Sequence, residues 1–373
     1  MTLVGAPYMV WAKQHARARW DLTPSNLLSC TVDDLPGARD AIELAGDNDN
    51  GYRPLIEAIA SRYGVSSEQV ATANGCSGAN FLVFAALLGS GDEVLVERPG
   101  YDPLLAAPQV LGARVIRFDR RHEDGYRLDP SAIAAALTPR TRLIVVTNAH
   151  NPTGVVASAS EIEALARVAE RAGIPVLVDE VYLDSAHDAD GRPAVSRSPL
   201  FISTGSLTKS YGLSGLRCGW VIGTADLAER VRRVRDVVDG TGPFPAERIA
   251  ALAFAHLDRL RARARAILEP NRAMVRDFLK GRPELDAADP AGGTVAFPRQ
   301  RGVADAGPFV KRLLDVYDTG VVPGRFFEAP AHFRLAFGGS AETLAGGLAR
   351  IGEALDQGSG IGDQGSDGPR PRL

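Results

Sequence analysis

Short apolar runs alternate with segments of helical spacing between residues 70 and 225. The runs are predicted to be strands and cover residues 93–97, 114–118, 143–147, 175–179, 200–203 and 220–223. Several are apolar on both faces, which is typical of buried, mostly parallel strands. Helical spacing between them covers residues 80–88, 129–137 and 160–172. The alternation predicts an α/β fold of three layers, a mostly parallel sheet with helices on both faces.

The pattern changes on either side of this region. An Arg- and Ala-rich stretch at 225–279 is predicted to form long helices that leave the sheet. The residues that follow mix short strands and helices, and the last ones offer little to bury, as in disordered segments. We therefore expect four parts, namely an N-terminal segment (1–44) that packs with a smaller domain, a large α/β domain (45–250), the smaller α+β domain entered by a long helix (251–355), and a disordered tail (356–373).

Composition and charge are ordinary for a soluble globular enzyme. The chain is 45% hydrophobic and 23% charged with a formal net charge of −3, which gives no reason to expect nucleic acid or an anionic membrane as a partner. No apolar run approaches the ~20 residues that span a bilayer, and no signal peptide is expected. Cys30, Cys76 and Cys218 are widely spaced, which favours free thiols in a reducing cytoplasm. The His residues form no metal-binding motif, so no metal site is expected.

Lys209 is the only lysine between Lys13 and Lys280 in a chain that otherwise uses arginine. A lysine can lose its proton when it is desolvated and can then attack a carbonyl group, whereas arginine stays charged. Ser206 and Arg217 lie close in sequence and offer groups that bind anions. An amine beside a phosphate cradle is what a Schiff base with pyridoxal phosphate requires.

Further polar residues fall at predicted strand ends, where ligands of open parallel sheets bind. The turn at 75–79 precedes a helix expected to begin near Ala79, so its backbone amides and the Ser77 hydroxyl could hold a phosphate. Tyr101 could stack on a flat ring. Asn151 and Tyr182 could reach a ring oxygen. Asp179 ends a hydrophobic strand and needs a cationic partner, which a pyridinium nitrogen would supply.

Three motifs occur together in order, namely Asn151-Pro-Thr-Gly, Asp179-Glu-Val-Tyr182, and Ser206-x-x-Lys209 followed by Arg217. On these motifs the chain resembles the fold-type-I pyridoxal-phosphate-dependent aminotransferases of class I/II, the aspartate aminotransferase superfamily, over residues 50–340. The resemblance implies a large cofactor-binding domain, a smaller domain and a homodimer in which each active site borrows groups from the other subunit.

The resemblance also implies a role for each matching residue. Lys209 would be the Schiff-base lysine and proton shuttle, Asp179 the partner of the pyridine nitrogen, and Arg334 the group that grips the substrate carboxylate. Tyr182 and Asn151 would contact the 3-oxygen of the ring, with Asn151 also near the substrate, and Tyr101 would cover one ring face. The phosphate would be held by Ser77, Ser206, Arg217 and the amides of Cys76 and Gly78.

One position departs from the family pattern. A tyrosine that reaches the cofactor phosphate of the neighbouring subunit usually precedes the segment that begins at Gly51, but Ala45 or Gly46 stands there. Tyr52 or an asparagine among residues 48 and 50 is the candidate replacement.

The leading hypothesis is a transaminase that moves an amino group from an L-amino acid to a 2-oxo acid. The same site can run other chemistry because the cofactor stabilises the carbanion, so a β-lyase or other aldimine chemistry is the alternative. Acyltransferases of this fold typically place a His soon after the Asp, and residues 179–182 contain none. A non-catalytic sensor usually brings an N-terminal DNA-binding module, for which the first 44 residues are expected to leave little room.

Overall fold

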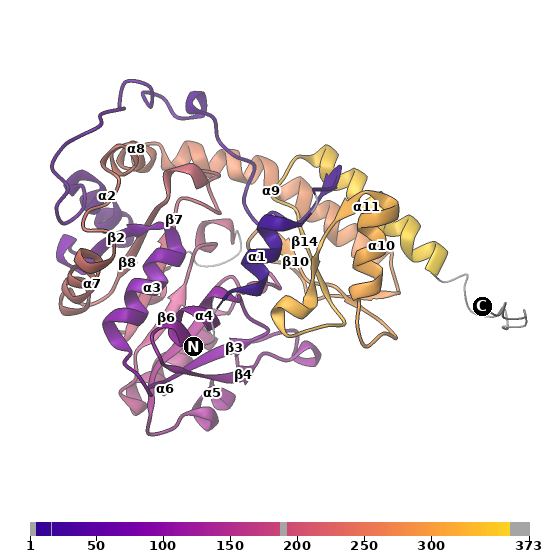
Figure 1. Cartoon of the computed structure of the whole chain (residues 1–373), viewed down its shortest axis with the longest axis horizontal. Coiled ribbons are helices and arrows are strands. Elements are labelled where there is room, and N and C mark those ends of the chain that lie inside the picture. Colours follow the sequence, from indigo (N-terminus) through magenta and orange to yellow (C-terminus); the bar gives the residue numbers. More distant parts are fainter. Residues whose placement is uncertain (1–4, 16, 187–191, 359–373) are drawn as a thin grey trace, which may run out of the picture.

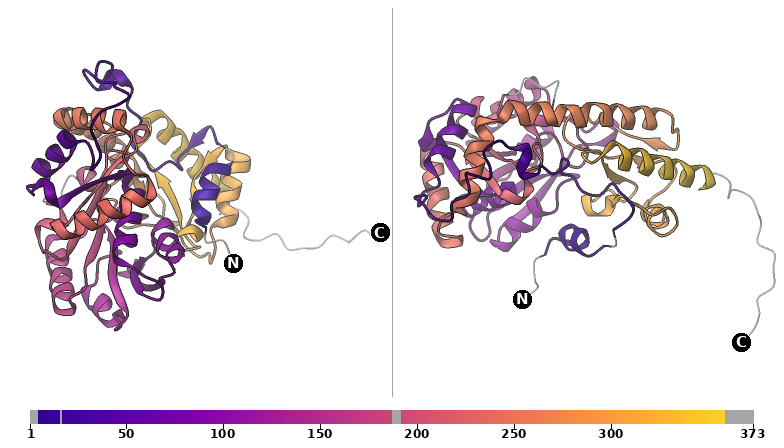
Figure 2. Two further views of the ribbon diagram at one scale, coloured as in Figure 1. Left: turned by 60° about the vertical axis from the view of Figure 1, so that its left-hand side comes forward. Right: turned by 90° about the horizontal axis from the view of Figure 1, so that it is seen from above.

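The computed structural model describes residues 5–15, 17–186 and 192–358. Figure 1 shows a larger unit around the sheet and a smaller unit built mainly from the C-terminal part of the chain. Helix α9 (Leu257–Lys280) extends from the larger unit along the smaller one, as the right-hand view of Figure 2 shows. Among the described helices, none is long and apolar enough to cross a membrane.

The larger unit is built on a seven-stranded sheet of order β2-β8-β7-β6-β5-β3-β4. Strand β8 runs antiparallel to β2 and β7, and the other neighbours are parallel. The strands are β2 Val70–Asn74, β3 Glu93–Arg98, β4 Arg114–Asp119, β5 Thr141–Thr147, β6 Val176–Asp179, β7 Phe201–Ser206 and β8 Cys218–Ile222. The predicted mostly parallel sheet is confirmed.

Helices cover both faces of the sheet because its central strands are apolar on both sides. In β3, Val94 and Val96 pack in one hydrophobic cluster and Leu95 packs in another on the opposite face. The first face is covered by α3 Gly75–Leu87, α4 Pro103–Val110 and α7 Ala225–Val238. The second is covered by α5 Pro130–Ala136 and α6 Ala159–Ala172, with α2 Arg53–Tyr63 and α8 Phe244–Ala255 over the β2–β8 edge.

The smaller unit packs helices against short strands. Its antiparallel sheet has the order β10-β14-β13, from Val295–Ala296, Phe333–Ala336 and Val322–Pro323. Helix α9 packs there with α10 Gly307–Tyr317 and α11 Ala341–Gly358. Two-stranded pairs complete it, β1 (Trp20–Asp21) with β12 (Thr319–Gly320) and β9 (Leu285–Asp286) with β11 (Arg299–Gln300). Short 3₁₀ turns join the elements, among them η4 Leu183–Ser185, η5 Ala194–Ser196, η6 Ser214–Leu216 and η7 Gly324–Phe327.

The N-terminal segment is divided between the two units, which corrects the expectation that residues 1–44 pack with the smaller one. Leu22 and Leu27 belong to the core of the smaller unit. Leu35 and Ala38 instead pack with residues of α2 and α8 in the larger unit. Between these two parts the chain crosses the junction of the units, and helix α1 (Pro7–Gln14) also lies there in Figure 1.

The end of the last helix also corrects an expectation. Residues 356–358, assigned from sequence to the disordered tail, belong to α11. Asp356 forms an ion pair with Arg282, and the Tyr317 hydroxyl donates to the Gln357 side chain at 2.7 Å. These partners lie just after α9 and at the end of α10, so their contribution could not be read from the tail composition. The remainder of the predicted tail lies outside the described residues.

Candidate active site

A cavity of about 210 Å³ lies at the carboxyl ends of the parallel strands. It contains side chains from β5–β7 and the loops that follow, from the start of α3, and from the N-terminal segment. The predicted residues that line it are Cys76, Ser77, Tyr101, Asn151, Asp179, Tyr182, Ser206, Lys209 and Arg217. Gly78 follows Ser77 in α3, and Arg334 reaches the cavity through its contact with Asn151. The fold therefore gathers into one place residues that lie far apart in the sequence.

The Lys209 amine is buried in this cavity, just beyond the end of β7. Burial and, to a smaller extent, the positive charge of Arg334 lower the pKa of Lys209 to about 7, while the Asp179 carboxylate opposes both effects. Its Nζ donates a hydrogen bond to Ser25 Oγ at 2.7 Å. Near pH 7 a substantial fraction of such an amine is neutral and can act as a nucleophile or base.

Asp179 is a buried carboxylate at the end of β6. It accepts hydrogen bonds from the Asn80 amide (2.7 Å), the Val181 backbone N–H (3.1 Å) and Cys76 Sγ (3.3 Å). Burial raises the pKa of Asp179, and these hydrogen bonds act against the rise. All three donors are neutral, so a cationic ring nitrogen in the cavity would stabilise the ionised carboxylate.

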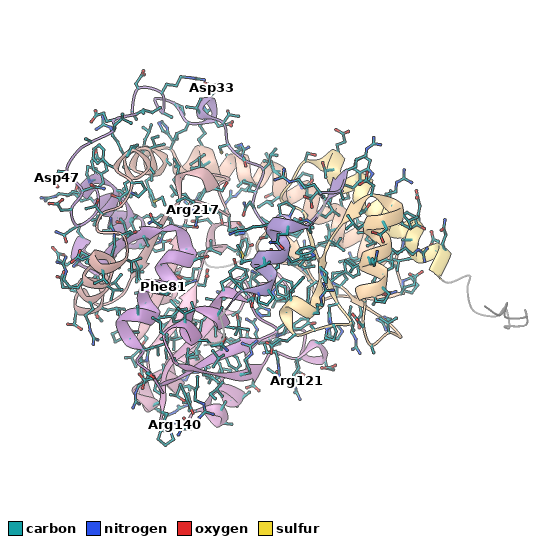
Figure 3. All side chains as sticks on the ribbon, viewed as in Figure 1. Asp33, Asp47, Phe81, Arg121, Arg140 and Arg217 are labelled. Carbon is teal, nitrogen blue, oxygen red and sulfur yellow. The ribbon has the colours of Figure 1, made fainter. Side chains whose placement is uncertain are left out.

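Helix α3 begins at Gly75, four residues earlier than the sequence indicates. Cys76, Ser77 and Gly78 therefore lie in its first turn, where backbone N–H groups have no partner within the helix and attract anions. A side chain at Gly75 would overlap the guanidinium of Arg217. Arg217 is exposed at the rim of the cavity, donates to the Asn74 carbonyl (3.3 Å), and lies near the centre of the view in Figure 3.

Arg334 in β14 is fully buried without an acidic partner among the described residues. Its guanidinium donates to Asn151 Oδ1 (3.2 Å), the Tyr8 hydroxyl (2.7 Å) and the Thr23 carbonyl (3.2 Å). Within the described structure its Nε has no hydrogen-bond partner. A buried arginine with neutral partners and an unused donor suits a planar carboxylate.

The two predicted tyrosines lie at the wall of the cavity. The Tyr182 hydroxyl donates to the Ser25 carbonyl at 3.1 Å, and burial raises the pKa of Tyr182. Tyr101 makes an edge-on contact with Tyr8, with ring centroids 6.0 Å apart, and its hydroxyl contacts Met9 Sδ at 3.4 Å. Residues of the N-terminal segment therefore contact both tyrosines.

Sequence reasoning missed the N-terminal contributors to the site. Ser25, Tyr8 and Thr23 contact Lys209 or Arg334, and Met9 and Asn26 line the cavity. No local motif marks these residues, because only the tertiary fold brings the segment to the sheet. Asn80 was also missed, although it is the one strongly polar residue in the apolar run of α3 after Ser77 and so could have been found.

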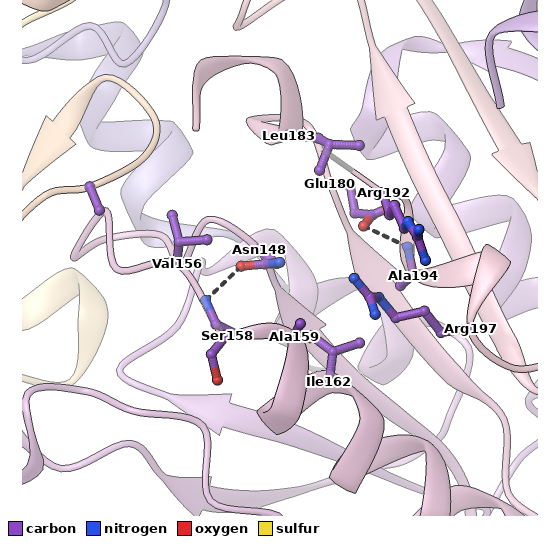
Figure 4. A pocket seen from close by; sticks show the side chains of 12 residues that line it. Asn148, Val156, Ser158, Ala159, Ile162, Glu180, Leu183, Arg192, Ala194 and Arg197 are labelled. Atoms are coloured by element: carbon purple, nitrogen blue, oxygen red, sulfur yellow. Dashed lines mark hydrogen bonds between the residues drawn. The ribbon is translucent and has the colours of Figure 1, made fainter. Parts of the chain in front are cut away.

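A second cavity, of about 450 Å³, lies behind the strand that carries Asp179. The next residue, Glu180, points into it, and Figure 4 shows its carboxylate accepting the Ala194 backbone N–H at 2.9 Å. Burial raises the pKa of Glu180 to about 7. Because successive side chains point to opposite faces at the end of β6, Asp179 points into the Lys209 cavity and Glu180 into the second cavity. Among the described residues, no group of three or more His, Cys, Asp or Glu could hold a metal ion.

Two asparagines near the position of the missing tyrosine are bonded within this subunit. A side chain at Gly46 would overlap the ring of Phe244. The amide of Asn48 is buried and donates to the Gly242 carbonyl (2.8 Å) and to Glu247 (3.2 Å), and Asn50 accepts from Arg233 (2.8 Å). Both N–H groups of the Asn48 amide are therefore used within this subunit, which argues against Asn48 as the replacement, and Tyr52 and Asn50 stay candidates.

Comparison with known proteins shows the family of the chain. The model of the family described as aminotransferase class I and II matches residues 37–351. The chain belongs to this family, and its members and structural neighbours use pyridoxal phosphate. The resemblance seen in the motifs, the enzyme class and the cofactor are confirmed.

Relatives of several activities share most of the chain. Capreomycidine synthase of Streptomyces vinaceus is 32% identical over 367 residues, which cover 95% of this chain and 94% of the relative. An arginine–pyruvate transaminase of Pseudomonas aeruginosa is 31% identical and covers 88% of this chain and 86% of its own length. A solved pyridoxal-phosphate-dependent aminotransferase from Streptococcus suis superposes with a TM-score of 0.90 at 29% identity, covering 96% of this chain and 99% of that one.

Proposed function

We propose that the protein transfers the amino group of an L-amino acid to a 2-oxo acid with pyridoxal phosphate bound in the Lys209 cavity. The observation that carries the proposal is that three buried groups meet at one cavity. They are an amine of lowered pKa, a carboxylate whose hydrogen-bond donors are neutral, and an arginine without an acidic partner among the described residues. Each of these groups is costly to bury alone.

The residues present fit the cofactor. Asp179 would pair with the ring nitrogen, and Asn151 and Tyr182 would contact the ring oxygen. Ser77, Ser206, Arg217 and the amides of Cys76 and Gly78 would hold the phosphate, and Tyr101 would cover one ring face. The hydroxyl of Thr208, which also lines the cavity, is buried and has no partner in the described structure, so it is a further available donor. When bound, the cofactor withdraws electrons from the α-carbon of the amino acid.

The residues of the chain then have separate tasks. Arg334 binds the α-carboxylate through two parallel N–H donors and so fixes the orientation of the α-carbon. Asp179, whose charged form the Asn80 amide and the Val181 N–H stabilise, would favour a protonated ring nitrogen. The neutral amine of Lys209 would remove the proton from the α-carbon of the amino acid and hold it as an ammonium until the proton is returned. The same amine would therefore serve both directions of amino transfer.

A second candidate is elimination or cyclisation with the same cofactor. It is favoured by the similarity over nearly the whole chain to capreomycidine synthase, whose name describes a synthase and not an aminotransferase. Both reactions begin with removal of the α-proton, so the residues assigned above serve either. What separates them is the fate of the electrons after that step.

A panel of amino donors separates the two functions. We expect purified holoenzyme to convert 2-oxoglutarate or pyruvate to the corresponding amino acid with at least one donor, with L-arginine tested first because of the arginine–pyruvate transaminase relative. Products are identified by mass. An amino donor that disappears while no oxo acid is aminated would contradict transamination and support the second candidate.

The proposal includes a homodimer in the cytoplasm. Large apolar side chains are exposed along the N-terminal segment, and Ile42 and Leu44 are 54% and 84% exposed. Such a patch is typical of a surface that another protein covers. The cytoplasmic location is supported by free Cys30, Cys76 and Cys218. Sedimentation analysis should give a dimer, and charge introduced by Leu44→Glu should weaken it, whereas exposed Val110→Glu in the larger unit should not.

A further inference from the structure

The N-terminal segment at residues 23–27 makes contacts with both the proposed base and the proposed carboxylate-binding arginine. The Thr23 carbonyl accepts from Arg334 at 3.2 Å. The Leu27 backbone N–H donates to the Lys209 carbonyl at 3.1 Å, and Asn26 lines the cavity. Five consecutive residues thus link β14 of the smaller unit to the loop after β7 of the larger one.

Ser25 lies at the middle of this segment and is buried. Its carbonyl accepts hydrogen bonds from the Tyr182 hydroxyl (3.1 Å) and the Thr294 hydroxyl (2.8 Å), so its backbone is held from two sides. Its own hydroxyl oxygen accepts the hydrogen bond from Lys209 Nζ at 2.7 Å. A held backbone with a short side chain gives this oxygen little freedom to move.

A lysine that serves as a base needs such a partner. The lysine side chain is long and flexible, and a free amine rotates about its last bond. One N–H bonded to a fixed oxygen stops that rotation and leaves the lone pair of the nitrogen free to accept a proton. Because misplacement of a reacting group by about 1 Å can cost roughly 100-fold in rate, this restraint matters for catalysis.

We propose that Ser25 is a positioning residue for Lys209, with its hydroxyl oxygen accepting one N–H of the amine whenever that amine is not bonded to the cofactor. The proposal rests on the function proposed above. In the neutral amine the lone pair takes the α-proton of the amino acid. The resulting ammonium keeps its hydrogen bond to Ser25 Oγ until the proton is returned, so one proton is taken, one is given back, and nothing is oxidised.

The first test measures the amine directly, without catalysis. Full-length protein freed of cofactor is labelled with trace acetic anhydride at a series of pH values, and acetylation is quantified by peptide mass spectrometry. Lys13, Lys280 and Lys311 are exposed and provide internal references. An acceptor favours the charged amine, so Ser25→Ala should lower the midpoint of Lys209 labelling by about one pH unit, and Ser25→Thr should restore it. An unchanged midpoint in Ser25→Ala would overturn the proposal.

The second test measures proton transfer in the holoenzyme. Ser25→Ala should lower kcat by about tenfold or more, leave KM for the amino acid within about twofold, and increase the kinetic isotope effect with α-deuterated donor. Ser29→Ala, at an exposed serine two residues beyond this segment, is the matched control and should behave as wild type. A fall in kcat without a larger isotope effect would mean a general structural role and would count against the proposal. If the wild type does not transaminate, the labelling test still decides the role of Ser25.

Discussion

The guanidinium of Arg334 donates a 2.7 Å hydrogen bond to the hydroxyl of Tyr8, a residue 326 positions earlier in the chain. The arginine also lies over the Tyr8 ring, with 5.2 Å between its Cζ and the ring centroid. Helix α1 and strand β14 therefore meet at the proposed carboxylate-binding group, so α1 belongs to the proposed active site.

Tyr8→Phe removes the hydroxyl and keeps the ring. We expect KM for both the amino acid and the 2-oxo acid to rise roughly tenfold, because a hydrogen bond to a charged group is worth about 1.5 kcal/mol or more. Steady-state kinetics with each substrate varied provide the measurement. Tyr317→Phe, which removes a hydroxyl bonded to Gln357 in the smaller unit, is the control. Equal KM values in wild type and Tyr8→Phe would show that Arg334 needs no support from α1.

Lys209→Arg should abolish covalent attachment of the cofactor while the protein still folds. Arginine preserves the positive charge but remains protonated and does not form the imine. Borohydride reduction followed by peptide mass spectrometry should find the adduct at residue 209 in the wild type and in Lys280→Arg, and nowhere in Lys209→Arg. An adduct mapped to Lys13, Lys280 or Lys311 would refute the assignment.

Asp179→Asn should leave the cofactor bound and reduce turnover by about 100-fold or more, because a neutral amide does not keep the ring nitrogen protonated. Cofactor content is read from absorbance, and turnover from initial rates. Turnover close to that of the wild type, at full cofactor content, would reduce Asp179 to a structural residue at the end of its strand.

Asn80→Ala tests how the carboxylate is kept ionised. The Asn80 amide donates to Asp179 at 2.7 Å, and its loss removes a bond that favours the charged form, so the pKa of Asp179 should rise further. The acidic limb of the kcat profile should then move to higher pH. Asn148→Ala, whose side chain accepts from Ala157 at the second cavity, should leave that limb in place.

The lowered pKa of Lys209 also predicts a pH dependence of stability for the protein without cofactor. In the unfolded chain the amine titrates near its usual pKa of about 10.4, whereas in the folded protein it titrates at about 7. Between these values the unfolded state binds more protons, so this group makes stability rise with pH, at up to about 1.4 kcal/mol per unit. Below pH 7 the amine is charged in both states, so the full free-energy cost of burying the charged Lys209 amine remains.

Lys209→Met isolates this contribution. Chemical denaturation at pH 7 and pH 9 should show that the free energy of unfolding increases more with pH in the wild type than in the variant. Other titrating groups are common to both proteins and cancel in the difference. A variant with the same pH dependence as the wild type would mean that the folded protein does not depress the pKa of Lys209.

The sequence by itself determined the layers of the fold and the chemistry of the site. Runs such as 143–147 are apolar on both faces, so they had to be buried between helices. Asn151 and Asp179 could be assigned because they lie at or just after the ends of predicted strands, and the carboxyl ends of parallel strands lie along one edge of the sheet. Lys209 could be assigned because it is a single lysine in a stretch that otherwise uses arginine. Strand β2 was not predicted, because its Val-Ala-Thr-Ala-Asn sequence has small side chains and no strong apolar pattern.

Only the tertiary structure decided what comes to that edge from elsewhere. Ser25, Tyr8 and Thr23 lie in a segment without a distinctive local pattern, and they reach Lys209 and Arg334 because the chain crosses between the two units. The start of α3 at Gly75 and the helical state of residues 356–358 likewise depend on partners distant in sequence. The periodicity of apolar residues indicates which faces of a helix or strand are buried. Hydrogen bonds between residues distant in sequence depend instead on how the helices and strands pack in three dimensions.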